Sequence, residues 1–234
     1  PRVSLVMDLV HALGWLEDGQ YVDSPVATPD QLARFHDRDY IEAVRRCEAA
    51  QSATDADKVR HNIGVNGNPV FGEIYRRPAT ACGATLAAVE LLRDGGVVFS
   101  PAGGTHHGQA GRASGFCYFN DPVLGLLAML DQGLDRIVYL DIDAHHCDGV
   151  EMALGDDPRI MILSVHERER WPFTGLTSDP AMRTYNYAMP RELNDSEFAH
   201  VLEAGILPLI EEFAPQAIMV QCGTDALADD PMSK

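Results

Sequence analysis

Short apolar runs that end in polar residues constrain the fold of this chain more than any other feature of its sequence. In chain order, the runs and the helical patterns between them cover about 79–94 (helix), 97–100 (run), 122–132 (helix), 136–143 (run), 159–166 (run), 196–213 (helix) and 217–222 (run). Nearly continuous apolar runs of this length are typical of strands buried on both faces, as in parallel sheets. Their alternation with helices predicts an α/β fold of three layers, in which helices cover both faces of a parallel sheet.

The unusual polar residues of the chain gather at the carboxyl ends of these runs. Residues 101–108 follow the first run, 141–148 end the second, and 223–225 follow the last. In open parallel sheets, ligands bind beyond the carboxyl ends of the strands. We therefore expect the three polar clusters to share one site.

The segment 141–148 reads Asp-Ile-Asp-Ala-His-His-Cys-Asp and holds three carboxylates and two imidazoles. Asp143 and His145 lie two residues apart at a strand end, where both can reach one metal ion. Asp225 offers a third ligand, although alone it would more often be a helix cap. Three protein ligands and one open position are typical of a catalytic metal site. Oxygen and nitrogen donors suit zinc, and iron(II) or manganese(II) also accept them.

Two adjacent histidines, His106 and His107, stand in a glycine-rich segment. Beside a metal ion, such a pair suggests a general base with an electrostatic or acid partner. Each imidazole then needs an acceptor for its far ring nitrogen. Asp141 and Asp148 are left for this role once Asp143 is assigned to the metal.

Composition narrows the class of protein further. The formal net charge of −17 disfavours direct nucleic-acid binding and suits an acidic surface that attracts cationic ligands such as lysine-rich peptides or polyamines. No apolar run approaches the roughly 18 residues that a membrane span needs. The five cysteines are odd in number, widely spaced and without a Cys-x-x-Cys pair, which favours a reducing cytoplasm. A length of 234 residues fits one large α/β domain.

Five segments of the chain match one family in order. They are Phe-His-Asp-Arg-Asp-Tyr-Ile at 35–41, Ser-Pro-Ala-Gly-Gly-Thr-His-His-Gly at 100–108, Gly-Phe-Cys-Tyr-Phe-Asn-Asp at 115–121, the run that continues to Gly-Val-Glu at 141–151, and Gln-Cys-Gly-Thr-Asp at 221–225. Together they resemble the histone deacetylase superfamily, and most closely the bacterial acetoin-utilisation deacetylases. The resemblance implies an α/β fold of the arginase/deacetylase type. It also implies zinc-dependent hydrolysis of acetyl-lysine in proteins or peptides, with iron(II) as a second candidate ion.

The resemblance also assigns roles to residues. Metal ligation falls to Asp143, His145 and Asp225. His107 serves as general base and then acid, with His106 beside it. Asp148 orients His107, and Asp141 orients His106. One wall of the acyl-lysine tunnel falls to Gly115 and Phe116. The opposite wall falls to the segment 170–173, where this sequence differs from the family's usual Phe-Pro-Gly and Trp171 is the residue we expect in that place. The residues around a structural potassium ion are Asp141, Asp143, His145, Ser164 and Val165.

The chain departs from the family pattern in two further places. The family carries an oxyanion-binding tyrosine after a glycine-rich stretch downstream of the Asp225 position, but this sequence ends at Lys234. We therefore expect a single deacetylase domain over 1–234 that lacks its extreme N-terminus and a C-terminal strand and helix, with an open sheet edge. The stretch at 64–69 also lacks the acid with which the family holds the substrate backbone.

Three alternatives remain open on the sequence. One is hydrolysis of a small acetylated amine, as in acetylpolyamine amidohydrolases. Another is a catalytically impaired fragment that only binds acyl-lysine. The third is a binuclear manganese ureohydrolase of the same fold, but Cys147 stands where that family needs an aspartate for its second metal.

Overall fold

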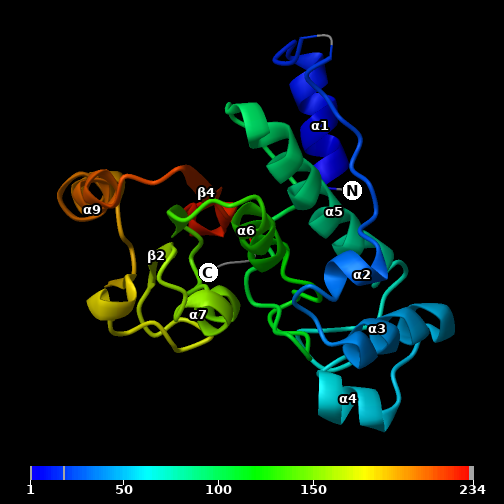
Figure 1. The fold of residues 1–234 in the computed structure, drawn as a ribbon. Helices are drawn as coiled ribbons and strands as arrows, with labels where there is room; N and C mark the ends of the chain where they lie inside the picture. Colours follow the sequence, from blue (N-terminus) through cyan, green and yellow to red (C-terminus); the bar gives the residue numbers. More distant parts are fainter. Residues whose placement is uncertain (1, 18, 232–234) are drawn as a thin grey trace.

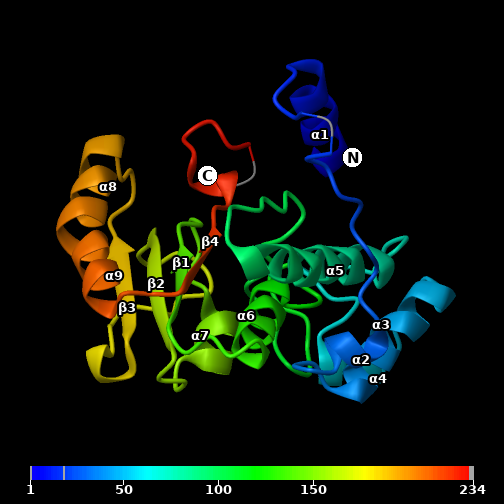
Figure 2. The ribbon, with the colours of Figure 1, turned by 45° about the horizontal axis from the view of Figure 1, so that its top comes forward.

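The computed structural model describes residues 2–17 and 19–231 (Figure 1). It contains a four-stranded parallel sheet, whose strands lie side by side in Figure 2. The strands are β1 (Ile137–Asp141), β2 (Ile160–Glu167), β3 (Thr184–Met189) and β4 (Ala217–Gln221), and their order across the sheet is β3-β2-β1-β4. The register places Asp141 beside Ser164 of β2 and Gln221 of β4. The carboxyl ends of these strands therefore meet at one edge of the sheet.

Helices cover both faces of this sheet (Figure 2). One face packs against α8 (Asp195–Val201), a π-helical segment (Leu202–Ile206) and α9 (Leu207–Phe213). The opposite face packs against α5 (Arg76–Leu91), α6 (Asp121–Asp131) and α7 (Asp148–Leu154). Successive strand residues point to opposite faces, so Val138 and Tyr139 belong to different apolar clusters. The predicted three-layer α/β architecture is confirmed.

The N-terminal helices lie beyond α5 and α6. They are α1 (Arg2–Ala12), α2 (Pro29–Leu32), α3 (Arg38–Ala50) and α4 (Asp55–His61). Helices α2 to α4 share a third apolar cluster with Tyr118 and Phe119, while α1 projects away from the sheet (Figure 2). Short 3-10 turns at Leu92–Asp94, Pro180–Met182 and Thr224–Ala226 complete the described elements. Across the described ranges, no helix is both long enough and apolar enough to span a membrane.

The prediction of a buried strand at residues 97–100 is wrong. The segment has no strand geometry, and the side chains of Val97 and Phe99 are 97% and 70% exposed. Strand β4 is also less buried than predicted, since Ile218 and Val220 are about half exposed. A pocket of about 580 Å³ is lined by residues 98–101 and by residues 218–221 of β4. A strand needs a neighbour to pair its backbone groups, and the described part of the chain places none between these segments.

Strand β3 was not predicted. Its partly buried residues Tyr185, Tyr187 and Met189 alternate with Asn186 and Ala188 instead of forming a continuous apolar run. Because β3 lies at the edge of the sheet, only one of its faces packs against α8 and the π-helical segment, and its sequence carries a weaker signal.

Candidate active site

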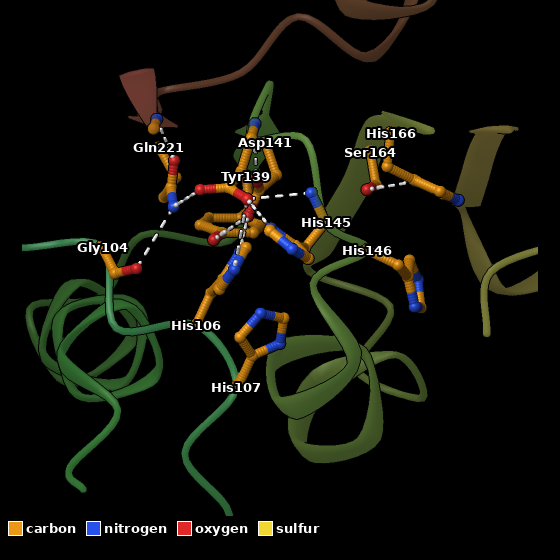
Figure 3. Close-up of polar contacts among 12 residues, drawn as sticks. Gly104, His106, His107, Tyr139, Asp141, His145, His146, Ser164, His166 and Gln221 are labelled. Atoms are coloured by element: carbon orange, nitrogen blue, oxygen red, sulfur yellow. Dashed lines mark hydrogen bonds and ion pairs between the residues drawn. The ribbon is translucent and has the colours of Figure 1, made fainter. Parts of the chain in front are cut away.

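The predicted polar clusters meet at the carboxyl edge of the sheet. Asp143 and His145 follow β1 directly, and Asp225 lies in the 3-10 turn after β4. One ligand atom from each of these three residues lies within 4.8 Å of the other two. The loop that carries His106 and His107 reaches the same place from the end of α5 (Figure 3).

The imidazole of His145 lies between two carboxylates. Its Nδ1 is 3.0 Å from Oδ1 of Asp143 and 2.9 Å from Oδ2 of Asp225. Burial acts against protonation of this ring, but the hydrogen bonds to the two carboxylates outweigh it and raise the pKa of His145 to about 9. A positive charge is thus strongly favoured where the three side chains meet. Two carboxylates and an imidazole nitrogen form a donor set that fits zinc, and iron(II) as well.

Each histidine of the adjacent pair has its own aspartate. Nδ1 of His106 is 2.7 Å from Oδ2 of Asp141, and Nδ1 of His107 is 2.6 Å from Oδ1 of Asp148. All four residues are buried, and the two imidazole rings lie 4.0 Å apart between centroids. A carboxylate only accepts hydrogen bonds, so both Nδ1 atoms carry a proton.

The two rings differ in charge. Burial lowers the pKa of His106, but Asp141, followed by Asp143 and Asp148, overcomes it and raises the value to about 9. Burial and then the neighbouring charge of His106 lower the pKa of His107 to about 4, despite its bond to Asp148. The arrangement therefore pairs a charged imidazole with a neutral one that can accept a proton.

The amino end of α6 holds the histidine loop in place. The side-chain amide of Asn120 donates to the carbonyls of His106 and Gly108, at 3.2 and 2.8 Å. The carboxylate of Asp121 accepts from the backbone N–H groups of Gly104 and Thr105. Gly104 has a φ of +94°, a conformation that suits glycine and starts the turn toward the two histidines.

Two residues at the site received no role from the sequence. Gln221, at the end of β4, donates to Oδ2 of Asp143 at 3.1 Å and to the carbonyl of Gly104 at 3.2 Å (Figure 3). The hydroxyl of Tyr139 donates to Oδ2 of Asp141 at 2.6 Å, the same oxygen that His106 contacts. A polar residue within or at the end of an otherwise apolar strand is the signal that would have found both.

Two of the residues predicted for the tunnel walls, Trp171 and Gly115, lie against His107. The indole ring of Trp171 lies 4.6 Å from the His107 ring, edge to face. Gly115, with a φ of +53°, lies against the same indole, because a Cβ there would be 2.4 Å from its Cη2 atom. The neighbouring Phe116 is 70% exposed, so it stands at the solvent side of this wall.

The residues predicted around a potassium ion are also neighbours. Asp141 of β1 pairs in register with Ser164 of β2, and Val165 follows Ser164. Asp143 and His145 lie immediately beyond Asp141. The hydroxyl of Ser164 is 2.9 Å from Nδ1 of His166.

The chain is similar in sequence to known proteins over its whole length. Residues 1–234 match the family described as "Histone deacetylase domain". Histone deacetylase 8 of Xenopus tropicalis is 33% identical over 240 residues, an alignment that covers 99% of this chain and 64% of that protein. Acetoin utilization protein AcuC of Bacillus subtilis is 30% identical over 241 residues, covering 99% of this chain and 62% of AcuC.

Solved structures agree. The crystal structure of an HDAC homolog complexed with SAHA has a TM-score of 0.89 and 35% identity, covering 99% of this chain and 64% of that one. The chain thus spans a little under two thirds of the length of these proteins. With the fold, the family match and the relatives in agreement, the chain belongs to the histone deacetylase family.

Proposed function

We propose that residues 1–234 form a single domain of a zinc-dependent amidohydrolase that removes acetyl groups from acetyl-lysine in proteins or peptides. The observation that carries the proposal is the meeting of Asp143, His145 and Asp225 beside two histidines that are each paired with an aspartate. The three ligands leave a coordination position open, as in catalytic zinc sites. Iron(II) is the second candidate ion for the same donor set.

The side chains of this chain divide the chemistry between them. A divalent ion held by the three ligands would supply a Lewis acid toward water and the acetyl carbonyl. Nδ1–H of His107 donates to Asp148, so its Nε2 is free to take a proton from the attacking water and to return it to the departing amine. The charged His106 offers positive potential to the oxygen that becomes negative.

Trp171 and Gly115 would form the wall along the acyl-lysine chain, with Phe116 at its outer end. The support is their contact with His107, the proposed base. An aromatic and glycine-lined wall suits the apolar methylene chain of a lysine side chain, whose burial contributes about 0.8 kcal/mol per methylene.

We also propose a structural potassium ion among Asp141, Asp143, His145, Ser164 and Val165. The oxygen donors that suit such a hard cation come from two neighbouring strands that are held in register. Its place beside the metal ligands would fix the end of β1, from which Asp143 and His145 emerge.

One observation favours a second substrate class, a small acetylated amine such as an acetylated polyamine. In the segment 64–69, the amide of Asn68 is turned inward: it donates to the carbonyl of Ala113 and accepts from the N–H of Phe116. Asn68 is 2% exposed, so its side chain bonds to the backbone of residues 113 and 116 and does not reach a peptide substrate at the surface.

The decisive experiment uses the protein loaded with one zinc ion per chain, the metal-free protein and the variant Asp143→Ala. We expect zinc-dependent binding of SAHA and zinc-dependent release of acetate from an acetyl-lysine peptide, both lost in the variant. Faster turnover of N-acetylputrescine than of the peptide would favour the second substrate class. Binding of SAHA without turnover of either would favour acyl-lysine recognition alone. Equal zinc content in the wild type and in Asp143→Ala would refute the ligand assignment.

We further propose that the protein works in a reducing cytoplasm. The support is that all five cysteines are free and that four of them are buried.

A further inference from the structure

A second pair of histidines, His146 and His166, lies outside the proposed catalytic machinery. Both rings are about 3% exposed, and their centroids are 4.8 Å apart. Although His146 follows the proposed ligand His145 directly, the two side chains point to opposite sides of the chain (Figure 3). Buried polar rings need a partner for each nitrogen, so the groups they contact show what the pair holds.

His166 contacts the segment that follows Trp171. Its Nε2 is 3.0 Å from the carbonyl of Gly175, which only accepts, so Nε2 carries the proton. In the neutral ring, Nδ1 then accepts from the hydroxyl of Ser164 at 2.9 Å. Two successive hydrogen bonds thus connect Ser164 to His166, both in β2, and His166 to the backbone of Gly175.

His146 contacts the same segment at two further points. Its Nδ1 is 2.8 Å from the hydroxyl of Thr174, while its Nε2 donates to Glu151 of α7 at 2.9 Å. Gly175, at a φ of +71°, packs on the face of the ring, since an added Cβ would lie 2.4 Å from Cδ2 of His146. Any side chain at position 175 would therefore push the segment off the ring.

The opposite end of this segment is Trp171. Its indole contacts the ring of His107 at 4.6 Å and that of His145 at 6.1 Å. Only two residues separate Trp171 from Thr174. The position of the indole therefore depends on the contacts that hold Thr174 to His146 and Gly175 to His166. The buried pair His146 and His166 is thereby linked through residues 172–175 to the indole that lies against His107.

We propose that His146 and His166 are positioning residues, which fix the segment 171–175 so that Trp171 closes the acyl-binding wall over His107. The inference deepens the proposed deacetylase function and rests on it for the identity of the bound group. In this proposal, His146 has a positioning role that is separate from metal ligation by its neighbour His145.

The test removes one attachment without touching either histidine. Thr174→Val deletes the hydroxyl and keeps the shape of the side chain, Thr174→Ser restores the hydroxyl, and Thr177→Val is a matched control at another exposed threonine of the loop. The sequence has two tryptophans, Trp15 and Trp171. All variants are made in a Trp15→Phe background, so that the tryptophan fluorescence comes from Trp171 alone. The readouts are acrylamide quenching of Trp171 fluorescence, zinc affinity, and the affinity of the zinc-loaded protein for SAHA.

In Thr174→Val we expect stronger quenching of Trp171 and SAHA affinity lower by about 2- to 10-fold, the effect of losing one hydrogen bond. Zinc affinity should stay within about twofold of the wild type, and Thr174→Ser and Thr177→Val should behave as the wild type. Unchanged quenching in Thr174→Val would overturn the proposal, as would equal changes in Thr177→Val. The quenching measurement needs no turnover, so it tests this proposal separately from the deacetylase function. If Thr174→Val increased the quenching of Trp171 but neither the wild type nor any variant bound SAHA, only the deacetylase function would be refuted.

Discussion

Replacing Gly223 with alanine tests the proposed metal centre without changing any of its ligands. Gly223 has a φ of −54°, which alanine adopts without strain. A Cβ on this residue would stand 1.9 Å from Oδ2 of Asp143 and 2.7 Å from its Cγ. Real Cβ contacts essentially never fall under 3.0 Å, so the Asp143 carboxylate must move by about 1.1 Å relative to residue 223.

That displacement is large for a metal ligand. Metal–ligand distances are held to within about 0.2 Å, and losing a single hydrogen-bond partner of a ligand already weakens metal binding roughly 10- to 100-fold. The movement would also break the hydrogen bond from Gln221 to Asp143. We therefore expect Gly223→Ala to lower zinc affinity by at least about 100-fold, or about 2.7 kcal/mol.

The assay is a competition titration against a fluorescent zinc chelator. Gly72→Ala is the matched control, because a Cβ on Gly72 meets nothing within 4 Å. Denaturant unfolding of both metal-free variants shows whether the fold is retained. If folded Gly223→Ala bound zinc as tightly as Gly72→Ala, Asp143 would not be the ligand that the geometry indicates.

Three other perturbations have defined outcomes. Asp148→Asn should slow acetyl-lysine turnover at least about 10-fold while zinc affinity holds, because His107 loses the charge that supports it; unchanged rates would contradict its role. Burial lowers the pKa of His36 from 6.5 to about 4, so the unfolded chain takes up a proton first as the pH falls. As the pH falls from about 6.5 to 5, protonation of His36 in the unfolded chain should therefore lower the free energy of unfolding by about 2 kcal/mol. If the free energy of unfolding of His36→Gln fell by the same amount over this range as that of the wild type, this would be refuted. Ile162→Ala, at a fully buried position of β2, should lower the free energy of unfolding by about 2–5 kcal/mol in denaturant unfolding, and a loss under about 1 kcal/mol would contradict its packing.

The parts of the fold that the sequence predicts well are those coded by local patterns. Continuous apolar runs mark β1, β2 and β4, and the helical periods mark α5, α6 and the α8-to-α9 region. The polar residues at the ends of β1 and β4 meet because parallel strands bring their carboxyl ends together. Distances within one segment, such as Asp143 to His145, follow from the same local geometry.

The remainder depends on contacts between distant segments. Residues 97–100 carry a strand-like sequence, yet a strand forms only with a partner alongside it. The contact of Gln221 with Gly104 joins residues 117 positions apart, so nothing in the sequence near either residue indicates it. The segment around Trp171 carries no local pattern that indicates a contact with His107, and the attachments of Thr174 and Gly175 to His146 and His166 join segments that are distant in sequence.

The shared oxygen of Asp141 has a consequence for how this site tolerates substitution. Oδ2 accepts from both Tyr139 and His106, while Oδ1 accepts from the N–H of Asp143. Removing either side chain leaves Oδ2 with one of these two donors, so the effects of changing Tyr139 and His106 are not additive. The two positions form one epistatic unit, in which the residue present at one site sets how damaging a substitution is at the other.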